Sequence, residues 1–91
     1  MYYAYVVKSE SNDFYYKGHC KNLATRVKQH NAGATKSLKP YLPVHLVYYE
    51  IFETRAAAIE RERYFKTAAG RKYFINKLKL SEVLYPGSLP E

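Results

Sequence analysis

A single carboxylate interrupts the apolar face of the segment that spans residues 55–69. This segment has the pattern of a helix. At about 100° per residue, its apolar side chains fall on one narrow stripe formed by Ala58, Ile59, Phe65 and Ala69. Glu62 lies in the middle of that stripe, whereas Glu60 points to the opposite, charged side. Because an ionised group on a core-facing stripe is costly unless it is paired or bound, Glu62 is a candidate functional residue.

The length and charge of the chain limit its fold and its partners. Ninety-one residues form one domain, with no room for a second core. Fifteen Lys and Arg against eight Asp and Glu give a formal net charge of +7. This surplus favours a polyanionic partner, with nucleic acid first, although many small basic proteins bind no DNA.

The cysteine content and the N-terminal residues indicate the cellular compartment. The single cysteine, Cys20, excludes an intramolecular disulfide and a cysteine-based zinc site, and it fits a reducing cytosol. The first residues lack the basic region and the long apolar run of a signal peptide. No stretch approaches the roughly 20 apolar residues that cross a bilayer. We therefore predict a cytoplasmic protein with no membrane partner.

The local signals predict an α/β protein of the α+β type, with the element order β-β-α-β-α-α. They place strands at 2–8 and 14–19, a helix at 22–30, a strand at 44–52, and helices at 55–69 and 71–80. Asn22 and Thr54 are suited to cap the helices that follow them, and Gly70 is expected to end or kink the helix before it. This order implies a small three-stranded antiparallel sheet flanked by helices. The domain is expected to span residues 1–80, and residues 81–91 to form a flexible tail.

Several side chains that can carry chemistry occur close together in this pattern. Strand alternation makes Tyr5 and Tyr16 candidates for one face of the sheet. Gly18, where the second strand ends, permits close approach of another chain or a phosphate. Arg26 and His30 are four residues apart and therefore share a helix face. We expect one glycine-edged cleft to bring together the two phenols, the guanidinium, the imidazole and the carboxylate described above.

Each of these residues also has a simpler structural interpretation. Tyrosines are common in half-buried sheets, and the glycine could form a bulge. His30 at a helix C-terminus could complement the helix dipole, and Arg26 could be a solvated charge. Glu62 could form a structural ion pair with Arg26 or with a neighbouring arginine. His19 and His45 belong to no group that the sequence identifies as a site.

Four short motifs, in this order, resemble those of the GIY-YIG nuclease domain. Tyr3-Ala4-Tyr5 stands where that family has Gly-Ile-Tyr, and Tyr16-Lys17-Gly18 stands where it has Tyr-Ile-Gly. The run Leu23-x-x-Arg26-Val27-x-x-His30-Asn31 is similar to the family's helix with the catalytic arginine. The run Ala58-Ile59-x-x-Glu62-x-x-Phe65-Lys66 resembles its helix with the metal-binding glutamate. The resemblance covers residues 2–75 and is greatest to small stand-alone members related to the nuclease domain of UvrC-type excision-repair proteins.

The resemblance implies metal-dependent hydrolysis of phosphodiester bonds in DNA by an endonuclease, with a role in DNA repair or recombination. It implies one Mg²⁺ or Mn²⁺ ion held by Glu62, which would bind weakly without substrate because one carboxylate is a poor cage. Arg26 would brace the scissile phosphate. Tyr5 and Tyr16 would position or deprotonate the attacking water. His30 would share the proton transfer or hold a phosphate oxygen.

Further residues are candidates for nucleic-acid binding, although the basic ones could also be solvated charges: Lys17, Gly18, Lys36, Lys39, Arg71 and Lys72. Many family members have a late asparagine near the site, and Asn76 is the only candidate in the last helix. DNA is the expected partner, with a protein partner or a homodimer for targeting. The alternative to a nuclease is a non-catalytic nucleic-acid-binding module or adaptor that retains the fold.

Overall fold

The central strand of the sheet is β1 (Tyr2–Ser9), which pairs on both sides with antiparallel neighbours. These are β2 (Tyr15–Cys20) on one side and β3 (Val44–Phe52) on the other, so the strand order is β2-β1-β3. The computed structural model describes residues 1–84 of the chain, with side chains described up to residue 80. The predicted three-stranded antiparallel sheet is confirmed.

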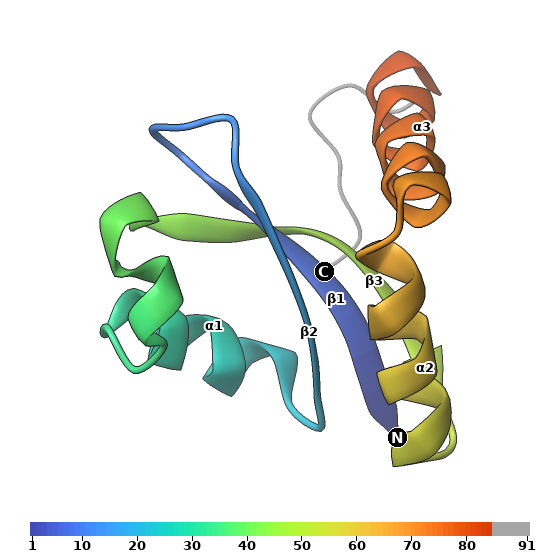
Figure 1. Cartoon of the computed structure of the whole chain (residues 1–91), viewed down its shortest axis with the longest axis horizontal. Helices are drawn as coiled ribbons and strands as arrows, with labels where there is room; N and C mark the ends of the chain where they lie inside the picture. Colours follow the sequence, from blue (N-terminus) through green and yellow to red (C-terminus); the bar gives the residue numbers. More distant parts are fainter. Residues whose placement is uncertain (85–91) are drawn as a thin grey trace.

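The helices lie on opposite sides of this sheet. The first helix, α1 (Leu23–Asn31), is followed by the short 3-10 helix η1 (Lys36–Tyr41), and both lie on one side. On the other side lie α2 (Arg55–Phe65) and α3 (Ala68–Leu84). Figure 1 shows β2 in front of the sheet, with α1 to its left and α2 to its right. The element order is therefore β-β-α-β-α-α, as predicted, with η1 added in the loop before β3.

Alternate residues of β1 belong to two apolar clusters, one on each face of the sheet, because side chains alternate along a strand. The buried cluster under α2 and α3 comprises Ala4, Val6, Val47, Phe65 and Phe74. The buried cluster under α1 and η1 comprises Tyr5, Val7, Cys20, Leu38 and Val44. The two faces of one short strand thus organise the whole core.

The boundary between α2 and α3 differs from the sequence prediction. The helix expected at 55–69 ends at Phe65, and α3 begins at Ala68 and runs through Gly70. The hydroxyl of Thr67 explains the break, since it donates to the Tyr64 carbonyl at 2.6 Å and accepts from the Gly70 amide at 3.0 Å. It therefore closes one helix and opens the next.

The role of Gly70 and the length of the last helix also need correction. Gly70 neither ends nor kinks a helix. It is buried where the first turn of α3 lies against the backbone of Tyr64. Ala69 is exposed and belongs to no buried stripe. The last helix, expected at 71–80, extends to Leu84, past the predicted start of the tail, and residues 85–91 lie outside the described part of the chain. Within residues 1–84, no helix is long and apolar enough to cross a membrane.

Replacing Gly70 by alanine is expected to destabilise the fold, although alanine favours helices over glycine by about 0.5–1 kcal/mol. The added Cβ would overlap the Tyr64 carbonyl and lie 2.9 Å from Cα of Phe65, so the backbone would have to shift. Such overpacking costs about 1–3 kcal/mol. Urea unfolding of Gly70→Ala should show this loss. The exposed Ala69→Ser variant should stay within about 0.5 kcal/mol of the wild type. A more stable Gly70→Ala variant would contradict the close packing.

Candidate active site

Tyr5 lies at the centre of β1, and its phenol crosses the sheet toward Gly18 on β2. The two residues are directly paired in the register of the strands, and Tyr5 is fully buried. A Cβ at position 18 would come within 2.5 Å of the Tyr5 hydroxyl oxygen and 2.7 Å of the ring carbon that bears it. The space left by the missing side chain of Gly18 is therefore filled by the phenol of Tyr5. The sequence had suggested that another chain or a phosphate would approach there.

His30 binds the Tyr5 hydroxyl from the last turn of α1. Its Nε2 lies 2.6 Å from the Tyr5 hydroxyl oxygen, and its Nδ1 lies 2.6 Å from Oγ1 of Thr35. The imidazole is 1% exposed, so both ring nitrogens are satisfied inside the protein. The side chain of Asn31 holds the end of α1 in place by bonding both backbone groups of Val44, at 2.8 and 3.0 Å.

Tyr16 and Arg26 complete the group on this face. The ring of Tyr16 meets the His30 ring edge-on, with centroids 5.2 Å apart, and the side chain is only partly buried. Arg26 lies one turn before His30 on α1, and its guanidinium acts on both Tyr5 and His30 by its charge. The structure thus brings together four predicted site residues, which we call the α1-side cluster: Tyr5, Tyr16, Arg26 and His30.

The buried members of this cluster are uncharged at neutral pH. Burial raises the pKa of Tyr5 well above its usual value of 10, although the nearby Arg26 opposes that rise. Burial, with the charge of Arg26 adding to it, lowers the pKa of His30. A neutral imidazole carries one N–H and one acceptor nitrogen. The Tyr5 and Thr35 hydroxyls therefore have opposite roles: one donates to the ring and the other accepts from it.

Glu62 on α2 meets two nitrogen donors. Its Oε1 lies 2.7 Å from Nδ1 of His19, and its Oε2 lies 2.7 Å from the ammonium of Lys66, one helical turn away. Burial acts to raise the pKa of Glu62, but the bonds from Lys66 and His19 outweigh it and the pKa is lowered. The carboxylate is therefore ionised at neutral pH. It pairs with a lysine and a histidine, in place of the arginine partner that the sequence left open.

Glu62 and the α1-side cluster lie on opposite faces of the sheet. His19 pairs with Ala4, whereas its neighbour Gly18 pairs with Tyr5, so the two β2 side-chain positions face opposite sides. The structure therefore divides the five residues expected around one glycine-edged cleft between the two faces of the sheet. The two halves flank the outer edge of the sheet, which β2 forms between α1 and α2 (Figure 1). Any shared ligand would have to lie across that edge.

The remaining predicted residues divide between the two faces. Lys17 faces the α2–α3 side, where burial lowers its pKa and the charges of Arg71 and Lys66 lower it further. Arg71 and Lys72 are exposed on the first turns of α3, and Asn76 is exposed further along that helix. The other two candidates, Lys36 and Lys39, are exposed on η1, on the α1 side.

Three residues that bond candidate site residues were not predicted as part of the site: His19, Thr35 and Lys66. Lys66 lies four residues after Glu62, at the end of the same helix, and that spacing could have identified it. Strand alternation could have placed the side chain of His19 on the opposite face of the sheet from Gly18. Its contact with Glu62 could not be predicted in this way, because that contact also depends on the position of α2. Thr35 bonds His30 from the loop after α1. No periodic signal places a loop residue, so Thr35 had no sequence signal. Tyr5, expected to touch the attacking water, is fully buried, and its hydroxyl is hydrogen-bonded to His30.

Comparison with known proteins shows the family of this chain. Residues 1–78 match the GIY-YIG catalytic domain. The chain belongs to this family. The UPF0213 proteins of Staphylococcus aureus strains Mu50, N315 and COL are each 40% identical to it over 72 residues, which cover 78% of this chain and 87% of each relative. No solved structure matches the chain. Membership in the GIY-YIG family implies a nuclease-like domain that acts on nucleic acid, typically with a divalent metal.

The donor set around Glu62 fits a metal ion that keeps most of its water. Among the described residues, no group of three or more His, Cys, Asp or Glu side chains could hold a metal ion. An ionised carboxylate oxygen is the hard ligand that Mg²⁺ prefers, and Mg²⁺ completes its shell with water and substrate phosphate. Glu62 therefore suits weak binding of a hydrated ion in this GIY-YIG domain.

His30 is expected to titrate below the usual imidazole pKa of about 6.5, because burial and the Arg26 charge disfavour the imidazolium. The unfolded chain then binds this proton more readily than the folded chain. The contribution of His30 to stability is complete above about pH 6.5 and is lost as the pH falls through its folded pKa. NMR titration of the ring should show the lowered pKa, and Arg26→Gln should move it upward. A His30 pKa above 6.5 in the wild type would contradict the buried geometry.

Proposed function

We propose that this GIY-YIG domain is a divalent-metal-dependent endonuclease that hydrolyses phosphodiester bonds of DNA. The observation that carries the proposal is that positively and negatively charged groups lie on the two sides of the β2 edge. A guanidinium and two phenols lie on one side of this edge, and an ionised carboxylate lies on the other. A phosphodiester held across the edge would meet both. Family membership supports the same reaction class.

Arg26 supplies the positive charge that the reacting phosphate needs. A guanidinium is always charged and presents a planar fork of donors that matches phosphate oxygens. Arg26 is half-buried on α1, beside the uncharged Tyr5 and His30, and among the described residues no carboxylate is paired with it. No carboxylate in the described part of the chain neutralises its charge, so the guanidinium can stabilise oxygens on which negative charge develops during hydrolysis.

The two tyrosines have different positions and therefore different roles. Tyr16 is only partly buried, so its hydroxyl can orient the attacking water. Tyr5 is fully buried and holds His30, whose ring in turn packs against Tyr16. We assign Tyr16 to contact with the water, and Tyr5 and His30 to the positioning of Tyr16 and Arg26.

Glu62 provides the negative charge on the other side of the edge. His19 and Lys66 fix both of its oxygens and keep it ionised, so the carboxylate is charged and oriented before an ion arrives. A divalent ion at this carboxylate would supply Lewis-acid chemistry, by neutralising phosphate oxygens and lowering the pKa of bound water. The Glu62 carboxylate would hold that ion on the side of the phosphate opposite Arg26.

The test is cleavage of labelled duplex, branched and single-stranded DNA, with RNA alongside, in Mg²⁺ or Mn²⁺. Glu62→Gln and Arg26→Ala should each lower the rate by about 100-fold or more, as expected when one charge-stabilising group is removed. The matched controls are Glu60→Gln, an exposed residue of α2, and Lys28→Ala, an exposed residue of α1. Both should cleave as the wild type does, and a chelator should stop all cleavage.

Two outcomes would contradict the proposal. Cleavage that survives both Glu62→Gln and Arg26→Ala would assign the activity to another site or to a contaminant. Binding of nucleic acid without cleavage of any of these substrates would favour the non-catalytic binding module. In that case Glu62→Gln should bind DNA more tightly than the wild type, because it removes a charge that repels phosphate.

A further inference from the structure

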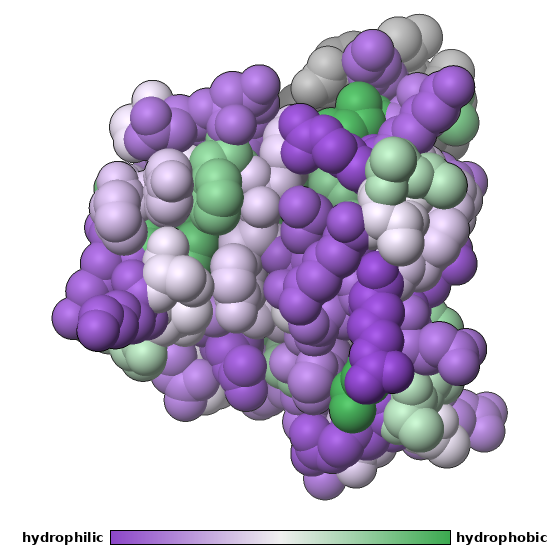
Figure 2. Space-filling view, viewed as in Figure 1, coloured by the Kyte–Doolittle hydropathy of each residue, from purple (hydrophilic) through white to green (hydrophobic). Residues whose placement is uncertain are grey.

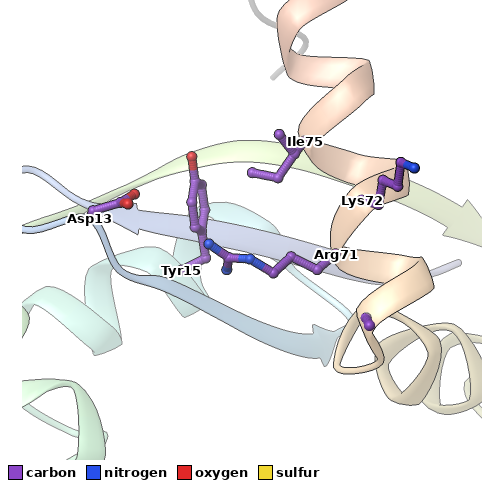
Figure 3. A pocket seen from close by; sticks show the side chains of 6 residues that line it. Asp13, Tyr15, Arg71, Lys72 and Ile75 are labelled. Carbon is purple, nitrogen blue, oxygen red and sulfur yellow. The ribbon is translucent and has the colours of Figure 1, made fainter.

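Several cations gather where α2 turns into α3, on the face that carries Glu62. We call this set the corner cluster, and it comprises Lys17, Lys66, Arg71 and Lys72. Arg71 and Lys72 line a hollow of about 470 Å³ together with Asp13, Tyr15, Ala68 and Ile75. Figure 3 shows the guanidinium of Arg71 reaching from α3 toward the ring of Tyr15, with Asp13 beyond that ring. Figure 2 shows strongly hydrophilic side chains along this side of the molecule.

The fold holds these cations close together at an electrostatic cost. The charges of Arg71 and Lys66 both act on the Lys17 ammonium, which burial disfavours further, so the pKa of Lys17 is lowered. Two acidic groups lie beside the cluster. Glu62 is bonded to Lys66 and to His19, and Asp13 lines the far side of the hollow. The cluster therefore keeps an excess of positive charge, which an anion would relieve.

Lys17 and Arg71 each contact an aromatic ring of the fold. The ammonium of Lys17 lies 3.5 Å from the Tyr15 carbonyl oxygen and 5.9 Å from the centre of the Phe74 ring. The guanidinium of Arg71 lies over the Tyr15 ring, 5.4 Å from its centre. Long side chains held in this way lose less conformational freedom when they bind a ligand. The surface is thus prepared for an anion of fixed geometry.

The cluster is continuous with the Glu62 half of the site. Lys66 bonds Glu62, and the charges of Lys66 and Arg71 both act on Lys17. The cations therefore form a path from the carboxylate at the β2 edge to the hollow on α3. A run of cations that starts at a nuclease carboxylate matches a chain of regularly spaced phosphates better than it matches one small anion.

We propose that the corner cluster binds the phosphodiester backbone that flanks the cleavage site, and so guides the nucleic acid from Glu62 across the α2–α3 corner. This inference rests on the proposed function and adds the direction in which the substrate leaves the site. It assigns Lys17 and Arg71 to two successive backbone contacts. Lys36 and Lys39, on the opposite side of the sheet, are assigned none of these contacts.

The test measures binding without cleavage. Fluorescence anisotropy of a labelled DNA duplex, in chelator and over a range of salt concentrations, gives the dissociation constant and its salt dependence. The double variant Lys17→Gln/Arg71→Gln should bind more weakly, and its log–log salt slope should fall by about 1.8, or about 0.9 for each lost phosphate contact. Lys28→Gln/Lys77→Gln removes the same charge from exposed residues outside the corner cluster and should keep the wild-type slope.

Further variants separate local contacts from net charge and from misfolding. Arg71→Gln alone avoids the half-buried Lys17 and should lower the slope by about 0.9, whereas Arg71→Lys keeps the charge and should preserve the slope. Thermal unfolding of each variant verifies that it is folded. Equal slopes for the two double variants, or an unchanged slope for Arg71→Gln, would overturn the proposal.

The same binding assay separates this inference from the proposed hydrolysis. If the wild type cleaves nothing in Mg²⁺ but the corner variants weaken binding in chelator, the hydrolysis proposal fails and the inference stands as a nucleic-acid-binding surface. If the wild type cleaves DNA and the corner variants bind as tightly as it does, only this inference fails.

Discussion

The hydroxyl of Tyr5 is the polar group on which the rest of the site depends. A buried hydroxyl must be hydrogen-bonded, because an unpaired one costs a few kcal/mol. His30 satisfies it from α1, Thr35 satisfies the other side of His30, and Gly18 on β2 leaves space for the phenol. One buried phenol thereby links β1, β2, α1 and the loop before η1. The positions of Tyr16 and Arg26 follow, since both lie against this linked group.

The location of the site follows from β2 being an edge strand. A strand with both edges paired would separate the two faces of the sheet completely, as β1 does. At β2 the faces meet, because Gly18 and His19 are consecutive and point to opposite sides. A cation-bearing cluster and an ionised carboxylate can therefore be built on separate cores and still serve one ligand. The α1-side cluster and Glu62 are packed on separate apolar cores. Neither group therefore needs the charge of the other for the chain to fold.

Local signals predicted most elements, because they depend on chemistry that is local in sequence. Asn22 and Thr54 do cap α1 and α2, through side-chain bonds to the amides of Thr25 and Ala57. The break between α2 and α3 was missed because helical periodicity continues through it. A single hydroxyl, that of Thr67, decides the boundary. Such a bond gives no periodic signal.

Part of the candidate site could be predicted for the same reason. Strand alternation grouped Tyr5 with Tyr16, helix spacing grouped Arg26 with His30, and the family resemblance joined the two pairs. The pairing of Glu62 with His19 could not be predicted, because this contact depends on how α2 lies across the sheet. Thr35 depends in the same way on the path of a loop. What the sequence left undetermined is therefore the placement of one element on another.

The charges around Glu62 bear on the proposed metal-dependent hydrolysis. An ionised carboxylate near the substrate repels phosphate until an ion binds, and a single carboxylate binds Mg²⁺ weakly. Here Lys66 and His19 already lie on the two carboxylate oxygens. They offset part of that repulsion and hold the side chain in one orientation. Under the proposed function, Glu62 would hold the divalent ion, and the Lys66 ammonium beside it would contact the phosphate.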